Sequence, residues 1–238
     1  MNRDVVKRHT AFCCVLLLLG ALWLRVGIRY VDRIKTNHTA LVSNPAALSV
    51  LIDPGHGGED GGAQGTDGTL EKAVNLAISL PLRDLLRLFG FSVTMTRETD
   101  TAIYAPIYAE TSGKKASDMR NRLALYEQAD CVVSIHQNHF SQEKYSGTQV
   151  FYSRNHPASK ELAQTIRHAV LSQLQPENTR ELKAADSNIF LLDHTTVPAV
   201  LVECGFLSNT AERDRLKDVA YQQQMALSVA TGVLHYNA

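Results

Sequence analysis

Downstream of residue 47, apolar positions along the chain follow two spacings. Short runs that alternate, or that are apolar throughout, predict strands, and longer runs with apolar residues three or four apart predict helices. The predicted strands are 48–53, 91–96, 131–136, 148–152, 188–192 and 200–203. The predicted helices are 71–89, 118–128, 157–174, 210–218 and 221–235, and Pro81 predicts a kink or break in the first. Because strands and helices alternate, we expect one α/β domain with a twisted, mostly parallel sheet covered by helices on both faces.

The first 48 residues show a different pattern. Residues 11–24 are apolar and uncharged, and as a helix they would extend about 21 Å, which suits the core of a signal peptide. If the Arg25 side chain reaches back to the membrane surface, the apolar length extends to residue 28 and about 27 Å, enough for a short anchor. We expect residues 1–28 to be a signal or anchor segment and favour an uncleaved anchor, because no small-x-small cleavage site follows; a cleaved signal and a buried helix are the alternatives. Residues 29–48 then form a tether to a domain spanning 49–238.

Charge separates the same two regions. The chain carries 24 basic and 24 acidic residues, but the first 35 residues hold seven basic and two acidic ones, so the rest is acidic by five charges. A neutral total without a basic cluster in the domain argues against nucleic-acid binding. The basic and apolar N-terminal 35 residues instead predict membrane contact. We therefore expect the protein at the outer face of the cytoplasmic membrane or secreted from the cell.

The overall composition is that of a globular protein. Hydrophobic residues make up 45% of the chain and charged residues 20%, which excludes a disordered chain, a collagen-like repeat and a multi-span membrane protein. Two of the four cysteines, Cys131 and Cys204, fall in the predicted domain, each within an apolar segment. We therefore expect buried free thiols rather than a disulfide.

Candidate chemistry follows three predicted strands. His56 comes after the first strand, His136 ends the third and Glu203 ends the last. In α/β folds, ligands bind beyond the carboxyl ends of the strands, so these side chains should meet at one edge. With Glu71 at the start of the first helix, two histidines and a carboxylate make the ligand set of a catalytic zinc site, and Glu203 could take a proton from the attacking water.

Each residue also has a structural interpretation. His56 could cap a glycine turn, Glu71 could be a first-turn carboxylate favoured by the helix dipole, and His136 could be structural. A phosphate loop at glycines 55, 57 and 58 is excluded, because the spacing matches neither known phosphate-binding motif. Glu203 is the hardest to dismiss, since a carboxylate that ends a buried strand needs a partner or a function.

Six motifs in order resemble one enzyme family. They are VLIDPGHGGEDGGA, LEKAVNLA, MTRETD, RLALYEQAD, SIHQNH and VLVECGFLSN. Over about residues 49–236 the chain is similar to the zinc-dependent N-acetylmuramoyl-L-alanine amidases of bacterial cell walls. The resemblance implies that His56, Glu71 and His136 bind Zn²⁺ and that Glu203 assists catalysis. It also implies peptidoglycan as the substrate, cut between the lactyl group of N-acetylmuramic acid and L-alanine.

Other expectations come from the same motifs. The resemblance implies substrate contacts from Asn138 and from Arg122, which stands at the family's arginine position. His139 could touch substrate, compete for metal or lie on the surface, and Arg120 could contact anionic groups or face solvent. The short span from residue 136 to 147 leaves no room for the occluding helix that some relatives hold there.

Chain length, the apolar segment and the run YSGTQVFYS further resemble the membrane-anchored amidases of spore formers that act on cortex peptidoglycan. That resemblance implies that the enzyme removes the stem peptide from muramic acid, after which a deacetylase builds muramic-δ-lactam. It leaves open whether a lipoprotein or other partner is needed to load zinc. Two other functions remain open at this point. One is an anchored, non-catalytic peptidoglycan-binding module, and the other is a zinc hydrolase of the same fold that acts on another amide.

Overall fold

A computed structural model describes residues 47–110 and 112–237. The described residues form a six-stranded sheet with the strand order β2-β1-β3-β6-β4-β5. Its strands are β1 (Ser49–Pro54), β2 (Ser92–Met95), β3 (Cys131–Asn138), β4 (Gln149–Tyr152), β5 (Lys183–Ala184) and β6 (Ala199–Phe206). The expected signal or anchor segment and nearly all of the tether lie outside the described residues, and no helix in the described part is long and apolar enough to cross a membrane.

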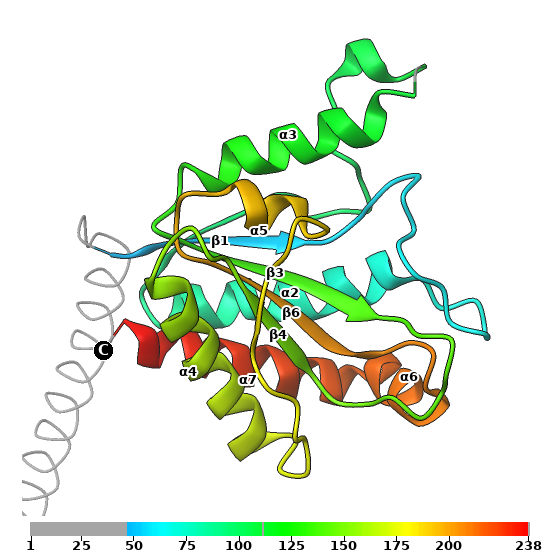
Figure 1. Cartoon of the computed structure of the whole chain (residues 1–238), viewed down its shortest axis with the longest axis vertical. Coiled ribbons are helices and arrows are strands. Elements are labelled where there is room, and N and C mark those ends of the chain that lie inside the picture. Colours follow the sequence, from blue (N-terminus) through cyan, green and yellow to red (C-terminus); the bar gives the residue numbers. More distant parts are fainter. Residues whose placement is uncertain (1–46, 111, 238) are drawn as a thin grey trace, which may run out of the picture. The chain divides into compact units, whose positions relative to one another are not determined.

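Helices cover both faces of the sheet (Figure 1). On one face lie α2 (Glu71–Leu88), α4 (Ala158–Gln173) and α7 (Val219–Tyr236), and on the other lie α3 (Lys114–Tyr126) and the short α5 (Phe190–His194). The helix α6 (Thr210–Lys217) follows β6, and a 3-10 turn, η1 (Pro106–Tyr108), precedes α3. The expected α/β architecture is therefore present.

Side-chain alternation along the strands builds two cores. Val50 and Ile52 of β1 point into the larger core, beneath α2, α4 and α7, whereas Leu51 between them points into the smaller core, beneath α3 and α5. In β6, Leu201 likewise enters the smaller core. Because successive side chains of a strand point to opposite faces, Glu203 belongs on the α3 and α5 side. The same alternation places His136 on that side.

The sheet is mixed: four of its five strand pairings are parallel, as the prediction of a mostly parallel sheet requires, and one is antiparallel. Strands β1, β2, β3 and β6 are parallel as predicted, but β4 runs antiparallel to β6 and β5 is parallel to β4. The two-residue β5 was not predicted, since it is short and exposed. Only β4 and β5 run in the opposite direction, so the carboxyl ends of β1, β3 and β6 still meet at one edge.

Two local predictions were wrong. Residues 188–192, predicted as a strand, enter α5: Asp186 accepts the Asn188 N–H at 2.9 Å and starts a turn that leads into the helix. A short apolar run does not distinguish a strand from a buried helix. Pro81 does not break α2, which continues to Leu88 with Leu82 and Leu86 fully buried. The buried face holds the helix together across the lost hydrogen bond.

Other boundaries shift by a few residues. The helix α3 begins at Lys114 instead of residue 118, because its first turn, residues 114–117, is Lys-Lys-Ala-Ser and leaves no apolar signal. Cys131 and Cys204 are buried free thiols, as expected.

The contact between α4 and α7 generates a stability prediction. A Cβ atom on Gly232 would lie 2.4 Å from the Cα of Ile166. Gly232→Ala should therefore lower the free energy of unfolding by about 1–3 kcal/mol, despite the better helix propensity of alanine. Urea denaturation measures the change. Thr231→Ala, which removes only a bond to the Leu227 carbonyl in the same helix, is the control and should be near neutral. A neutral Gly232→Ala would contradict the close packing.

Candidate metal centre and active site

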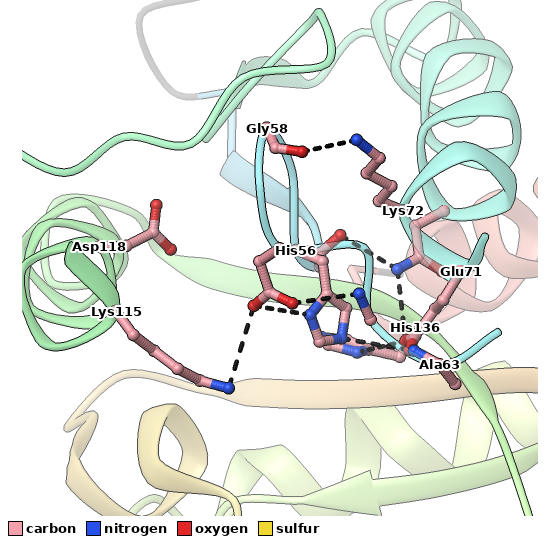
Figure 2. Close-up of polar contacts among 12 residues, drawn as sticks. His56, Gly58, Ala63, Glu71, Lys72, Lys115, Asp118 and His136 are labelled. Atoms are coloured by element: carbon pink, nitrogen blue, oxygen red, sulfur yellow. Dashed lines mark hydrogen bonds and ion pairs between the residues drawn. The ribbon is translucent and has the colours of Figure 1, made fainter. Parts of the chain in front are cut away.

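Three side chains with metal-binding groups converge at the carboxyl edge of the sheet. His56 follows β1, His136 lies in β3, and Glu71 is the first residue of α2. One ligand atom from each lies within 4.8 Å of the others, and Figure 2 shows the three side chains meeting from separate elements. Glu71 Oε2 lies 3.2 Å from His56 Nε2, and Glu71 Oε1 lies 2.9 Å from His136 Nδ1. The structure thus brings together the three residues that the sequence predicted as ligands.

Glycines allow these side chains to approach. A Cβ atom on Gly55 would lie 2.2 Å from the His136 ring, and one on Gly62 would lie 2.5 Å from Glu71 Oε2. His56 itself has a φ of 62°, in the left-handed region that non-glycine residues rarely adopt. The glycine-rich turn therefore holds the backbone of His56 in a strained conformation and leaves room for the His136 ring.

Backbone donors fix the Glu71 carboxylate between the two imidazoles. Its Oε1 accepts the Gln137 N–H at 3.0 Å, and its Oε2 accepts the Ala63 N–H at 2.8 Å. Glu71 is buried. Burial opposes its ionisation, but the contacts with His136 and His56 hold the pKa of Glu71 well below its usual range. The residue is therefore an anion that cannot easily turn away from the site.

Asp60 lies behind the other nitrogen of His56. Asp60 Oδ2 is 3.0 Å from His56 Nδ1, and Asp60 Oδ1 accepts the Gly62 N–H at 3.1 Å. Burial by itself would lower the pKa of His56, but the Glu71 and Asp60 carboxylates raise it. A carboxylate behind a metal-binding histidine fixes the ring orientation and the tautomer.

The donor set fits a catalytic zinc ion. Zinc sites of hydrolases commonly use two imidazoles and a carboxylate and leave one position open for water or substrate. The ring centroids of His56 and His136 are 5.0 Å apart, and a nitrogen of each ring lies within 4.8 Å of the other and of a Glu71 oxygen. These three residues can hold such an ion without rearrangement of the backbone.

Glu203 lies beside this cluster. The register of β3 and β6 pairs it with His136, and its Oε2 atom is buried without a hydrogen-bond partner among the described residues. Burial raises the pKa of Glu203 to about 7. An unpartnered buried carboxylate is costly, and one with a pKa near neutrality suits proton transfer.

A buried ion pair supports the turn from below. Asp53, in β1, and Arg122, in α3, are almost completely inaccessible to solvent. Arg122 donates through Nη1 to Asp53 and through Nη2 to the His56 carbonyl at 2.8 Å, while its Nε donates to Asp118 at 2.6 Å. The sequence predicted Arg122 as a substrate contact. Its side chain is 1% exposed and engaged with the turn, which indicates a positioning role. Arg122 also lines the cavity over the cluster, so the substrate contact stays a prediction.

A cavity of about 650 Å³ opens over the metal-binding cluster. The sheet edge forms its floor, and α3 and α5 supply the opposite walls. Asn138 and His139 do not line it: Asn138 is the last residue of β3, and His139 is exposed. Sequence reasoning missed most of the wall residues, because it placed the start of α3 too late and predicted a strand at α5. The wall residues are Lys115, Ala116, Met119, Arg120, Asn188, Ile189, Phe190, Leu191 and Leu192, and of these the sequence had named only Arg120, as a candidate contact for anionic groups.

The fold and the cluster agree with one family. A family model described as N-acetylmuramoyl-L-alanine amidase matches residues 50–235. The chain belongs to this family, and it is an enzyme that hydrolyses the bond between the N-acetylmuramoyl group and L-alanine in peptidoglycan.

Individual relatives narrow the likeness. The chain is 38% identical over 189 residues to the germination-specific N-acetylmuramoyl-L-alanine amidase of Bacillus subtilis, a match that covers 79% of this chain and 78% of that protein. It is 30% identical to the amidase AmiA of Escherichia coli, over 79% of this chain and 75% of that protein. Among solved structures, the CwlD amidase from Clostridioides difficile, in complex with the GerS lipoprotein, superposes with a TM-score of 0.76 at 39% identity. That match covers 80% of this chain and 98% of the solved one.

The buried ion pair generates the next prediction. Asp53→Asn should lower the free energy of unfolding by about 3 kcal/mol at pH 7, the low end for a broken buried pair, because Asp118 still faces Arg122. Burial alone would raise the pKa of Asp53, but Arg122, Tyr126 and Thr96 lower it from 3.8 to about 2. The stabilisation by the ionised form is therefore present above about pH 4 and is lost as the pH falls through 2.

Denaturation of both proteins at several pH values measures this difference. The gap in unfolding free energy between the wild type and Asp53→Asn should narrow between pH 4 and pH 2. Asp214→Asn, which changes an exposed carboxylate, is the control and should stay within about 0.5 kcal/mol of the wild type. A gap that is independent of pH would show that the ionised form of Asp53 does not contribute the stability.

Proposed function

We propose that His56, Glu71 and His136 bind a zinc ion and that Glu203 moves the proton during hydrolysis of the muramoyl amide. The observation that carries this proposal is the unpartnered Glu203 carboxylate beside a complete two-histidine, one-glutamate donor set. When bound, zinc would polarise the amide carbonyl and make the attacking water more acidic. A non-catalytic binding module would have no use for this combination.

Glu203 serves both proton transfers in this scheme. It accepts a proton from the water whose oxygen bonds to the lactyl carbonyl carbon, and it gives that proton to the nitrogen of L-alanine as the carbon–nitrogen bond breaks. A carboxyl group with a pKa near the working pH can act first as the base and then as the acid. Asp60 and the Asp53–Arg122 pair keep His56 in place throughout.

Substitution of Glu203 separates proton transfer from metal binding. Glu203→Gln keeps the size of the side chain but cannot accept the proton, so the rate of amide cleavage should fall by about 10²–10⁴-fold while bound zinc is retained. His136→Ala should lose zinc as well, because only two ligands remain. Release of stem peptides, followed by mass spectrometry, and zinc content by elemental analysis measure the two effects. Full activity in Glu203→Gln would exclude its assigned role.

We further propose that the substrate is spore-cortex peptidoglycan. Support comes from the similarity to the germination-specific amidase and to the CwlD amidase. In this proposal the enzyme strips the stem peptide from muramic acid so that a deacetylase can build muramic-δ-lactam. The apolar N-terminal segment would hold the domain at the outer face of the membrane. A lipoprotein partner is proposed because the solved CwlD structure is a complex with the GerS lipoprotein.

Two experiments test the amidase activity and the cortex assignment separately. The domain should release stem peptides from purified cortex and from vegetative peptidoglycan in the presence of zinc, and a chelator should abolish both reactions. In a spore former, deletion of the gene should remove muramic-δ-lactam from the cortex, which mass spectrometry of digested spores would detect. Normal lactam content in the deletion strain would contradict the cortex role but leave the amidase activity standing.

A further inference from the structure

The cavity over the metal-binding cluster has walls of different chemistry. Its floor presents the acidic groups Asp60 and Glu203 beside the histidines, and the α5 wall presents apolar side chains such as Ile189 and Phe190. The α3 wall differs from both, because it presents cations. Since the guanidinium of Arg122 is already engaged with Asp53 and Asp118 below the floor, the cations available to a ligand are Lys115 and Arg120.

Lys115 extends over the cavity from the first turn of α3. Its Nζ atom lies 4.0 Å from Asp60 Oδ2, and its side chain is 77% exposed. That Asp60 oxygen is already 3.0 Å from His56 Nδ1, so the ion pair with Lys115 is long and shared. In Figure 2 the Lys115 side chain extends from its helix toward the space beside His56, and a dashed line marks this ion pair. An ammonium group held this loosely can exchange its partner for another carboxylate at little cost.

Arg120 lies further along α3 and also lines the cavity. Its guanidinium carbon is 5.9 Å from the centroid of the Tyr108 ring, and no carboxylate among the described residues lies within ion-pair distance of it. Ala116 and Met119 lie between the two cations on the cavity wall. The α3 wall therefore combines a small apolar surface with a cation on each side.

We propose that Lys115 and Arg120 bind a free carboxylate of the stem peptide, and that this contact positions the leaving group for cleavage. The inference rests on the proposed function, which places the scissile amide at the metal-binding cluster. One residue of extended peptide spans about 3.3–3.6 Å. Contacts of 3.0 and 4.0 Å link His56 to the Lys115 ammonium through Asp60, so the cation lies one or two residues along a peptide that starts at the cluster. Lys115 and Arg120 are then specificity residues rather than catalytic ones.

Two matched substrates test the proposal. Muramoyl tripeptides with free stem carboxylates and the same tripeptides with those carboxylates amidated are cleaved by zinc-loaded wild type and by the double variant K115Q/R120Q. The wild type should prefer the free acid by about tenfold or more in kcat/KM, mainly through KM, as expected for a charge-assisted contact. The double variant should lose this preference and cleave the amidated substrate as well as the wild type does. Lys115→Arg, which keeps a cation at both positions, should retain the preference.

The controls separate this inference from the proposed function. Lys160→Gln changes an exposed cation on α4, outside the cavity, and should leave both KM values unchanged. Zinc content and thermal stability of the double variant should equal those of the wild type, since both side chains are exposed. If the wild type cleaves both substrates equally, or if the double variant loses activity equally on both, the carboxylate site is wrong while the amidase assignment stands. If zinc-loaded wild type cleaves neither, the proposed function itself fails.

Discussion

The ion pair between Asp53 and Arg122 joins the core of the domain to its chemistry. Asp53 lies near the end of the inner strand β1, and Arg122 extends from α3 to contact it. The pair therefore links the sheet to the helix that covers it. The same guanidinium holds the His56 carbonyl, and with it a residue whose backbone is in the left-handed region. A strained residue persists only where its surroundings determine it. The position of His56 thus depends on the Asp53–Arg122 ion pair, which is buried.

Around that pair, the alternation of side chains along each strand decides which face of the sheet a residue occupies. In β1, β3 and β6, one face supplies mainly Val and Ile to the core under α2, α4 and α7. The other face packs in the smaller core and carries polar groups toward the cavity near the carboxyl ends of these strands. A shift of one residue in β3 or β6 would bury His136 or Glu203 in the large core. The buried apolar residues before them set the register that prevents this shift.

Much of this arrangement is readable in the sequence. His56, His136 and Glu203 each follow an apolar run, and the strand order of α/β folds brings such positions together, so the cluster could be predicted without a structure. Arg122 could not be assigned in the same way, because a helical arginine gives no sign of whether it points to solvent or to a buried aspartate. The prediction of a strand at residues 188–192 was wrong for a related reason. Five mainly apolar residues fit a strand or a helix equally well, and only the turn at Asp186 decides between them.

The short α5 helix also separates two properties of the enzyme. The floor of the cavity is built from strand ends that the core holds rigidly, whereas α3 and α5 form walls whose side chains face the cavity from outside the sheet. Substitutions in these walls can change which peptides fit without moving a metal-binding group. Hydrolysis and substrate choice can therefore diverge separately during evolution, and an inhibitor that gains its affinity from the walls would distinguish between enzymes that share the same floor.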